Sequence, residues 1–203
     1  MPDKILFIHG LASSGAYKMA SMLRQLLRPA EVIAPDVPIA PDAALTLLQE
    51  IIRRQQPDLV VGMSLGGFWA QQLSGPPRVL INPSFHCSRL MQTMVGRVEW
   101  LSPRADGETA FLLTDSLCEA YRQLEDRQFD DVTPADRLRT LGCFAREDER
   151  VRDADEFLRH YPDRAFFYEG GHLPTYPQMK FSVVPAIRRF LSEDPEPPFQ
   201  KPF

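Results

Sequence analysis

The sequence contains no long hydrophobic run, and this absence limits where the protein can act. No apolar stretch among its 203 residues approaches the roughly 20 residues that a membrane-spanning helix needs. The first apolar run, residues 5–8, is too short for a secretory signal peptide, and no small-residue cleavage site follows it. We therefore expect a cytoplasmic protein that does not act at a membrane.

An excess of one charge and closely spaced cysteines are also absent. The 23 basic and 27 acidic residues leave a net charge of −4 and form no basic stripe, so nucleic acid is not an expected partner. Cys87, Cys118 and Cys143 are too far apart for a C-x-x-C pair or a metal-ligand pattern, which predicts reduced thiols and no metal site. Neither a G-x-G-x-x-G motif nor a P-loop follows the first apolar run, which disfavours a nucleotide-binding protein.

Short apolar runs alternate with helical patterns along the chain. This alternation predicts an α/β protein whose parallel sheet is covered by helices on both faces. We expect six strands in a mainly parallel sheet of order 2-1-3-4-5-6, which places the reversal of strand order between strands 1 and 3. The expected strands are residues 4–8, 32–34, 59–61, 79–81, 141–145 and 165–168.

Residues 1–192 are expected to form a single domain. Within it, residues 83–134 interrupt the strand–helix rhythm, and we interpret them as a small cap or insert after strand 4, because long inserts are often functional. An ordinary crossover helix with a long loop is the alternative. Residues 193–203 contain four prolines and no periodicity, which predicts a C-terminal tail.

The most informative motif is Gly62-Met63-Ser64-Leu65-Gly66. It lies between a short apolar run and a predicted helix, and strand, G-x-S-x-G, helix is the arrangement of a nucleophile elbow. The turn holds the serine side chain above the edge of the sheet. A serine hydroxyl is a weak nucleophile at neutral pH and needs a base within hydrogen-bond reach. The motif therefore predicts that Ser64 is a catalytic nucleophile.

The best candidate for that base is His172. It ends Glu169-Gly170-Gly171-His172, directly after the last predicted strand, at the edge of the sheet that Ser64 faces. We interpret His9 as a structural residue of the first loop and His160 as a surface residue near a helix end. His86 lies in the insert, where a role in a substrate pocket is an open alternative.

The third catalytic residue should be a carboxylate after the fifth strand, where it would orient the imidazole. Residues 145–153 contain several acids; Asp148 is preferred, and Glu147 and Asp153 are alternatives. The chain order Ser64, Asp148, His172 is typical of the α/β-hydrolase fold. Two backbone N–H groups, those of Leu65 and Leu11, are the expected oxyanion hole.

The chain resembles the small bacterial esterases of the YqiA type, a UPF0227-like branch of the α/β hydrolases with little or no lid. The resemblance implies a serine hydrolase that cleaves small carboxylic esters, with short acyl groups and no cofactor. The matching segments are Leu6–Ser14, Val37–Pro38, Pro41–Ala44, Gly62–Gly67, Asn82–Pro83, Asp148–Glu149 and Glu169–His172.

Two departures from that pattern bear on the site. The acid loop lacks the family's glycine and has one more residue before Val151, so Glu147 and Asp153 stay as alternatives to Asp148. Gly171 replaces an asparagine found in some relatives, which should alter loop rigidity more than chemistry. A thioesterase with the same triad is an alternative, as is a catalytically silent binding protein with this fold.

Overall fold

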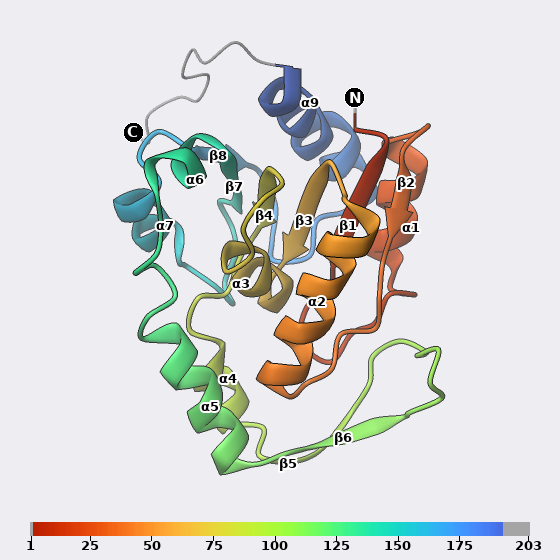
Figure 1. The fold of residues 1–203 in the computed structure, drawn as a ribbon, viewed down its shortest axis with the longest axis vertical. Helices are drawn as coiled ribbons and strands as arrows, with labels where there is room; N and C mark the ends of the chain where they lie inside the picture. Colours follow the sequence, from red (N-terminus) through yellow and green to blue (C-terminus); the bar gives the residue numbers. More distant parts are fainter. Residues whose placement is uncertain (1, 193–203) are drawn as a thin grey trace.

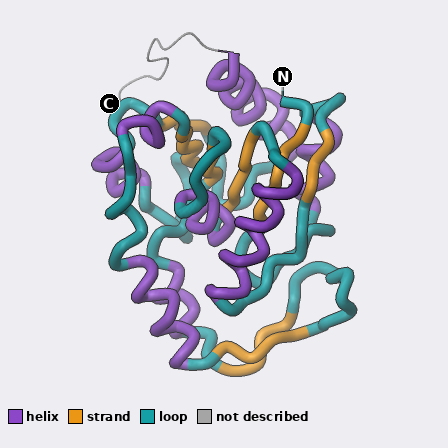
Figure 2. Tube along the Cα trace, viewed as in Figure 1, coloured by secondary structure: helices purple, strands orange, loops and turns teal. Residues whose placement is uncertain are grey.

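The central feature of the fold is a six-stranded parallel sheet with helices on both faces (Figures 1 and 2). It is seen in a computed structural model that describes residues 2–192, so the tail predicted at residues 193–203 lies outside the described residues. The strands run in the order β2-β1-β3-β4-β7-β8. Their bounds are β1 Lys4–Ile8, β2 Glu31–Ile33, β3 Leu59–Met63, β4 Arg78–Ile81, β7 Thr140–Ala145 and β8 Ala165–Tyr168.

This order confirms the predicted 2-1-3-4-5-6 arrangement. The numbering differs because two further strands, β5 (Gly96–Glu99) and β6 (Ala110–Leu113), pair with each other as a separate antiparallel hairpin. The strands β1, β3, β4 and β7 consist largely of apolar residues that are buried on both faces of the sheet, as parallel strands covered by helices must be. Their apolar runs are therefore the strongest strand signals in the sequence.

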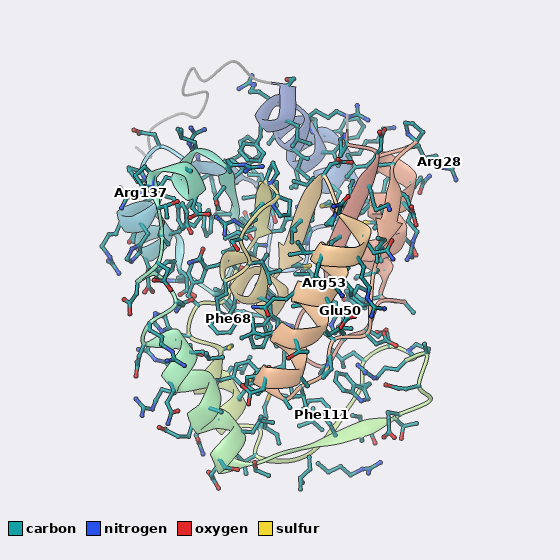
Figure 3. The ribbon with its side chains drawn as sticks, viewed as in Figure 1. Arg28, Glu50, Arg53, Phe68, Phe111 and Arg137 are labelled. Carbon is teal, nitrogen blue, oxygen red and sulfur yellow. The ribbon has the colours of Figure 1, made fainter. Side chains whose placement is uncertain are left out.

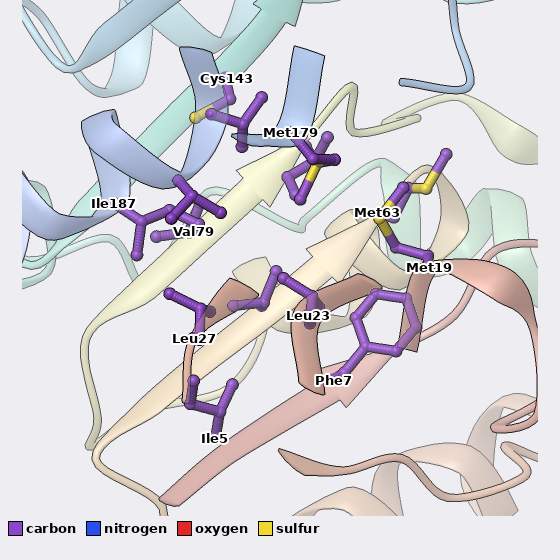
Figure 4. Packing of buried hydrophobic residues seen from close by; sticks show 14 of the residues in the cluster. Ile5, Phe7, Met19, Leu23, Leu27, Met63, Val79, Cys143, Met179 and Ile187 are labelled. Atoms are coloured by element: carbon purple, nitrogen blue, oxygen red, sulfur yellow. The ribbon is translucent and has the colours of Figure 1, made fainter. Parts of the chain in front are cut away.

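Alternate residues of each strand pack against different helical layers. In β1, Ile5 and Phe7 belong to one hydrophobic core, with α1 (Lys18–Leu26) and α9 (Val184–Ser192) (Figure 4). Leu6 and Ile8 belong to the other core, on the opposite face of the sheet. That second core is covered by α2 (Pro41–Gln55), α3 (Leu65–Gln71), α4 (Cys87–Gln92), α5 (Asp115–Glu125) and α7 (Ala154–His160).

The last helix, α9, is preceded by α8 (Tyr176–Gln178) and a π-helical turn, Met179–Val183, which carry the helical path back toward the last strand. In α2, Asp42 lies in the first turn, where its negative charge favours the helix dipole. The outer side of α2 carries exposed ion pairs such as Arg53 with Glu50 (Figure 3), which add little stability.

Residues 83–134 fold as α4, the β5–β6 hairpin and α5, which together lie at the end of the molecule opposite α9 (Figure 1). A buried carboxylate joins the two helices: Glu125 of α5 accepts hydrogen bonds from the Ser88 amide at 2.7 Å and the Ser88 hydroxyl at 2.5 Å. The hairpin is held to the first loop, because the Leu101 amide donates to the Ala12 carbonyl at 2.7 Å. A short helix, α6 (Pro134–Leu138), leads from this region back to the sheet.

No helix within residues 2–192 combines the length and the apolar character that crossing a bilayer requires.

The three cysteines are unpaired and buried, at no more than 3% exposure. Burial raises the pKa of all three thiols, and the neighbouring Glu125 carboxylate raises that of Cys87 further. Because the thiolate is the reactive form, we expect 5,5′-dithiobis(2-nitrobenzoate) to modify the folded protein at least about 100-fold more slowly than the urea-unfolded chain. Equal rates in the two states would contradict this placement of the thiols.

Candidate active site

Ser64 lies at the turn between β3 and α3, in a conformation that few non-glycine residues adopt. Its backbone has φ 54° and ψ −119°. The turn is possible because the strand, the helix and the neighbouring loop approach very closely at glycines: a Cβ on Gly62 would overlap the Gly66 carbonyl, and one on Gly66 would overlap the Ile8 carbonyl. The local backbone strain at Ser64 is typical of a functional position.

Gly66→Ala tests this tight packing. We expect it to lower the free energy of unfolding by about 3 kcal/mol or more, because the new methyl group must displace backbone atoms of β1. Gly171→Ala is the matched control, since its Cβ would lie 3.9 Å from the nearest atom, an ordinary contact distance. Urea unfolding of both variants measures the difference, and similar losses would contradict the packing described.

The structure brings the three predicted catalytic side chains into one hydrogen-bonded row. His172 Nε2 lies 3.0 Å from Ser64 Oγ, and His172 Nδ1 lies 2.8 Å from Asp148 Oδ2. With Nδ1–H donating to the carboxylate, Nε2 is left to accept the serine proton. The row joins the ends of β3, β7 and β8, three segments far apart in the sequence.

Asp148 is itself held in place by the backbone of its own loop. Its Oδ1 accepts hydrogen bonds from the Arg150 amide at 2.9 Å and the Val151 amide at 3.0 Å, which leaves Oδ2 for His172. Burial disfavours the charged form, but the hydrogen bonds from His172 and from these amides outweigh it, so the pKa of Asp148 lies below its ordinary value. The carboxylate is therefore ionised at neutral pH.

The two alternative acids point elsewhere. The Asp153 carboxylate accepts a hydrogen bond from the Phe85 amide at 2.6 Å, and burial raises its pKa. Glu147 is exposed. Among the described residues, Asp148 is the acid whose carboxylate contacts His172.

Asn82, at the end of β4, is a positioning residue that the sequence reasoning did not assign. Its side-chain amide donates to the His172 carbonyl at 2.8 Å and to the Tyr168 hydroxyl at 2.9 Å. Its Oδ1 accepts from the Ala145 amide at 2.8 Å. Asn82 therefore ties the histidine loop to the ends of β7 and β8. An asparagine directly after a buried strand, at the edge where the motifs gather, was the available signal.

The other histidines have separate partners. His9 donates from Nδ1 to the Gly10 carbonyl at 2.9 Å and accepts at Nε2 from the Val37 amide at 3.0 Å, so it holds the first loop together as predicted. Burial lowers the pKa of His9, which keeps the ring neutral. His86 lies 2.5 Å from Glu156, and the ring of His160 stacks on Phe129 at 3.9 Å.

The predicted oxyanion residues lie on either side of Ser64. Leu65 follows the serine and begins α3. Leu11 belongs to the first loop, which passes directly against the serine: a Cβ on Gly10 would lie 3.3 Å from Ser64 Cβ.

A cavity of about 650 Å³ opens over Ser64 and His172. The insert supplies much of its wall, together with the first loop and the acid loop. Residues from the insert include Leu90, Met94, Val98 and Leu101, and the first loop contributes Leu11 and Ala12. The size and the largely apolar lining suit a small organic molecule.

The comparison with protein families identifies the relatives of this chain. The model of an uncharacterised protein family, UPF0227, matches residues 4–152. The chain belongs to the UPF0227 family. This confirms the family resemblance predicted from the motifs. No curated protein matches this UPF0227 member.

Solved structures similar to this UPF0227 protein share the α/β-hydrolase fold. Est1E from Butyrivibrio proteoclasticus aligns with a TM-score of 0.65 and 13% identity, covering 94% of this chain and 88% of Est1E. An esterase domain from Rhodothermus marinus aligns at 0.59 and 18%, covering 91% and 85%. AidH, an N-acyl homoserine lactonase complexed with N-butanoyl homoserine, aligns at 0.59 and 17%, covering 95% and 91%. The α/β-hydrolase fold predicted from the sequence is thereby confirmed.

Proposed function

We propose that this UPF0227 protein is a serine hydrolase that cleaves carboxylic esters of small organic molecules. The observation that carries the proposal is the row of hydrogen bonds from Asp148 through His172 to Ser64 beside a cavity of about 650 Å³. The similar structures include an esterase domain and an N-acyl homoserine lactonase, which agrees with the proposal. At such low sequence identity the similarity shows the fold alone, so the proposal rests on the geometry of the site.

In the proposed mechanism, Ser64 Oγ attacks the ester carbonyl while His172 Nε2 takes the hydroxyl proton. Asp148 holds the imidazole in the required tautomer and stabilises the imidazolium that forms. The amides of Leu65 and Leu11 donate hydrogen bonds to the oxyanion, and Leu65 gains from its place at a helix start. His172 then protonates the departing alcohol, and a water activated by the same ring releases the acid. These reaction steps use no cofactor.

The insert, residues 83–134, is proposed to act as a small cap within the single domain. It forms part of the cavity wall through α4 and the hairpin, and the first loop and the acid loop form other parts of that wall. No separate lid is required for this arrangement. We propose short acyl groups because the family resemblance implies them. Apolar side chains of the cavity wall such as Met94 and Val98 would contact the acyl group.

A panel of p-nitrophenyl esters of increasing acyl length tests this function. We expect turnover that is highest for short acyl chains and that disappears in Ser64→Ala. An esterase and a thioesterase would use the same residues, so the site alone does not separate them. Parallel assays with thioesters of the same acyl groups show which substrate is turned over faster. A folded wild-type protein with no turnover of any ester or thioester would favour the silent binding protein instead.

A further inference from the structure

Three arginines line the cavity without forming a salt bridge in the part of the chain that the structure describes. Arg89 lies on α4, and Arg150 and Arg152 lie on the loop that carries Asp148. All three are exposed. Within residues 2–192, none of the three guanidinium groups forms an ion pair or a side-chain hydrogen bond, whereas Arg78, Arg104, Arg122 and Arg146 each pair with an acid. We call Arg89, Arg150 and Arg152 the basic rim.

Two acids, Asp153 and Glu99, also line the cavity, and Asp153 interacts electrostatically with Arg89. Asp153 is engaged by the Phe85 amide at 2.6 Å, and Glu99 belongs to the hairpin. Glu156 is engaged by His86 at 2.5 Å. Glu147 and Glu149 are exposed on the acid loop but do not line the cavity.

The basic rim comes from two segments of the cavity wall, α4 and the acid loop. The contacts of Phe85 with Asp153 and of His86 with Glu156 bind the start of α4 to the acid loop and α7, which brings Arg89 toward Arg150 and Arg152. The hairpin contributes the apolar side chains Val98 and Leu101 where it binds the first loop. The cavity wall therefore combines three cations with apolar side chains.

We propose that the substrate of this site is an ester that carries an anionic group, a carboxylate or a phosphate, which the basic rim binds. Guanidinium groups bind both anions through charge-assisted hydrogen bonds. The three arginines outnumber the two acids of the lining, Asp153 and Glu99, so the cavity wall carries a positive charge that favours an anionic ligand. The inference rests on the proposed function, because it names the substrate class of the same site.

The test compares anionic esters with neutral partners of similar size. On the acyl side, 4-nitrophenyl hydrogen glutarate is paired with 4-nitrophenyl methyl glutarate. On the alcohol side, the butyrate ester of glycolate is paired with that of glycolamide, and 2-(butyryloxy)ethyl phosphate supplies the phosphate arm. We expect kcat/KM to favour at least one anionic ester by about tenfold, in line with a charge-assisted hydrogen bond, and the preference to shrink as salt is raised.

The variants Arg89→Gln and Arg152→Gln, alone and combined, test whether the basic rim causes the preference for anionic esters. Arg150 is left unchanged because its amide holds Asp148. The combined variant, which keeps only Arg150 of the basic rim, should lower the ratio of anionic to neutral kcat/KM several-fold toward one. Arg159→Gln is the matched control: it removes the same charge from an exposed position on α7 that does not line the cavity, and should keep the wild-type ratio.

Calorimetric binding of the same ester pairs to Ser64→Ala separates the failure of this inference from the failure of the proposed function. Preferential binding of an anionic ester, lost when Arg89 and Arg152 are also replaced, would uphold the basic rim even if wild type showed no turnover. Turnover with equal kcat/KM for all pairs, or a preference that the arginine variants leave intact, would overturn it. Equal binding of all pairs would overturn it as well.

Discussion

Replacing Ser64 by alanine should lower kcat/KM for a short-chain p-nitrophenyl ester by roughly 10⁴-fold or more. The change removes the only atom that the proposed mechanism uses to form the acyl-enzyme, while His172 and Asp148 keep their mutual hydrogen bond at 2.8 Å. The smaller side chain fits the same turn, so circular dichroism and urea unfolding should show a folded protein. Initial rates from purified wild type and variant measure the effect.

Ser182→Ala is the matched control for that substitution. Ser182 lies in the π-helical turn before α9, away from the residues that line the cavity, and its replacement should leave the ester kinetics of wild type. Comparable turnover by Ser64→Ala and wild type would remove Ser64 from the role of nucleophile.

The second large effect is expected from Asp148→Asn. An asparagine at this position retains an acceptor for the Arg150 and Val151 amides, but it carries no charge and favours the wrong tautomer of His172. We expect kcat to fall by roughly 10⁴-fold, as when a buried triad aspartate becomes an amide in other serine hydrolases. Steady-state kinetics at neutral pH measure the loss.

Two acids on the same loop serve as comparisons for Asp148→Asn. Glu147→Gln changes an exposed carboxylate and should leave kcat within a few-fold of wild type. Asp153→Asn should cost far less than Asp148→Asn, because an amide oxygen can still accept from Phe85. If Asp153→Asn proved the more damaging of the two, the role of triad acid would pass to Asp153.

The lowered pKa of Asp148 also predicts a pH dependence of stability. A carboxyl whose pKa is lower in the folded state stabilises the protein above its ordinary value, here 3.8, and loses that contribution as the pH falls through the folded pKa. Wild type should therefore be more stable than Asp148→Asn near neutral pH, with the difference narrowing in acid below 3.8. Urea unfolding of both proteins at several pH values checks this; a difference that grows in acid would contradict it.

Most of the sheet could be predicted from the sequence because its inner strands, β1, β3, β4 and β7, are buried on both faces. The half-buried edge strand β8 is also a continuous apolar run, and both β1 and β8 begin and end at the predicted residues. The hairpin is different: Gly96–Glu99 alternates between half-buried and exposed residues over only four positions, too short for a reliable strand signal.

The candidate site shows the same contrast. Ser64 and His172 follow recognisable local patterns, a G-x-S-x-G turn and a glycine-rich loop after a strand. The sequence favoured Asp148 but left Glu147 and Asp153 as alternatives, because the choice depends on which way one loop turns each carboxylate. The basic rim could not be predicted from the sequence either. Contacts between distant segments bring Arg89 to the arginines of the acid loop.

The most direct test of the account is the site of covalent labelling by a fluorophosphonate. Such a probe reacts with a serine whose hydroxyl is activated by a neighbouring base. Mass spectrometry of the digested adduct should find one equivalent of label on the peptide that contains Ser64, and His172→Ala should abolish the reaction. A folded wild-type protein that takes up no label, or carries it on another serine, would contradict the claim that Asp148, His172 and Ser64 act as one catalytic unit.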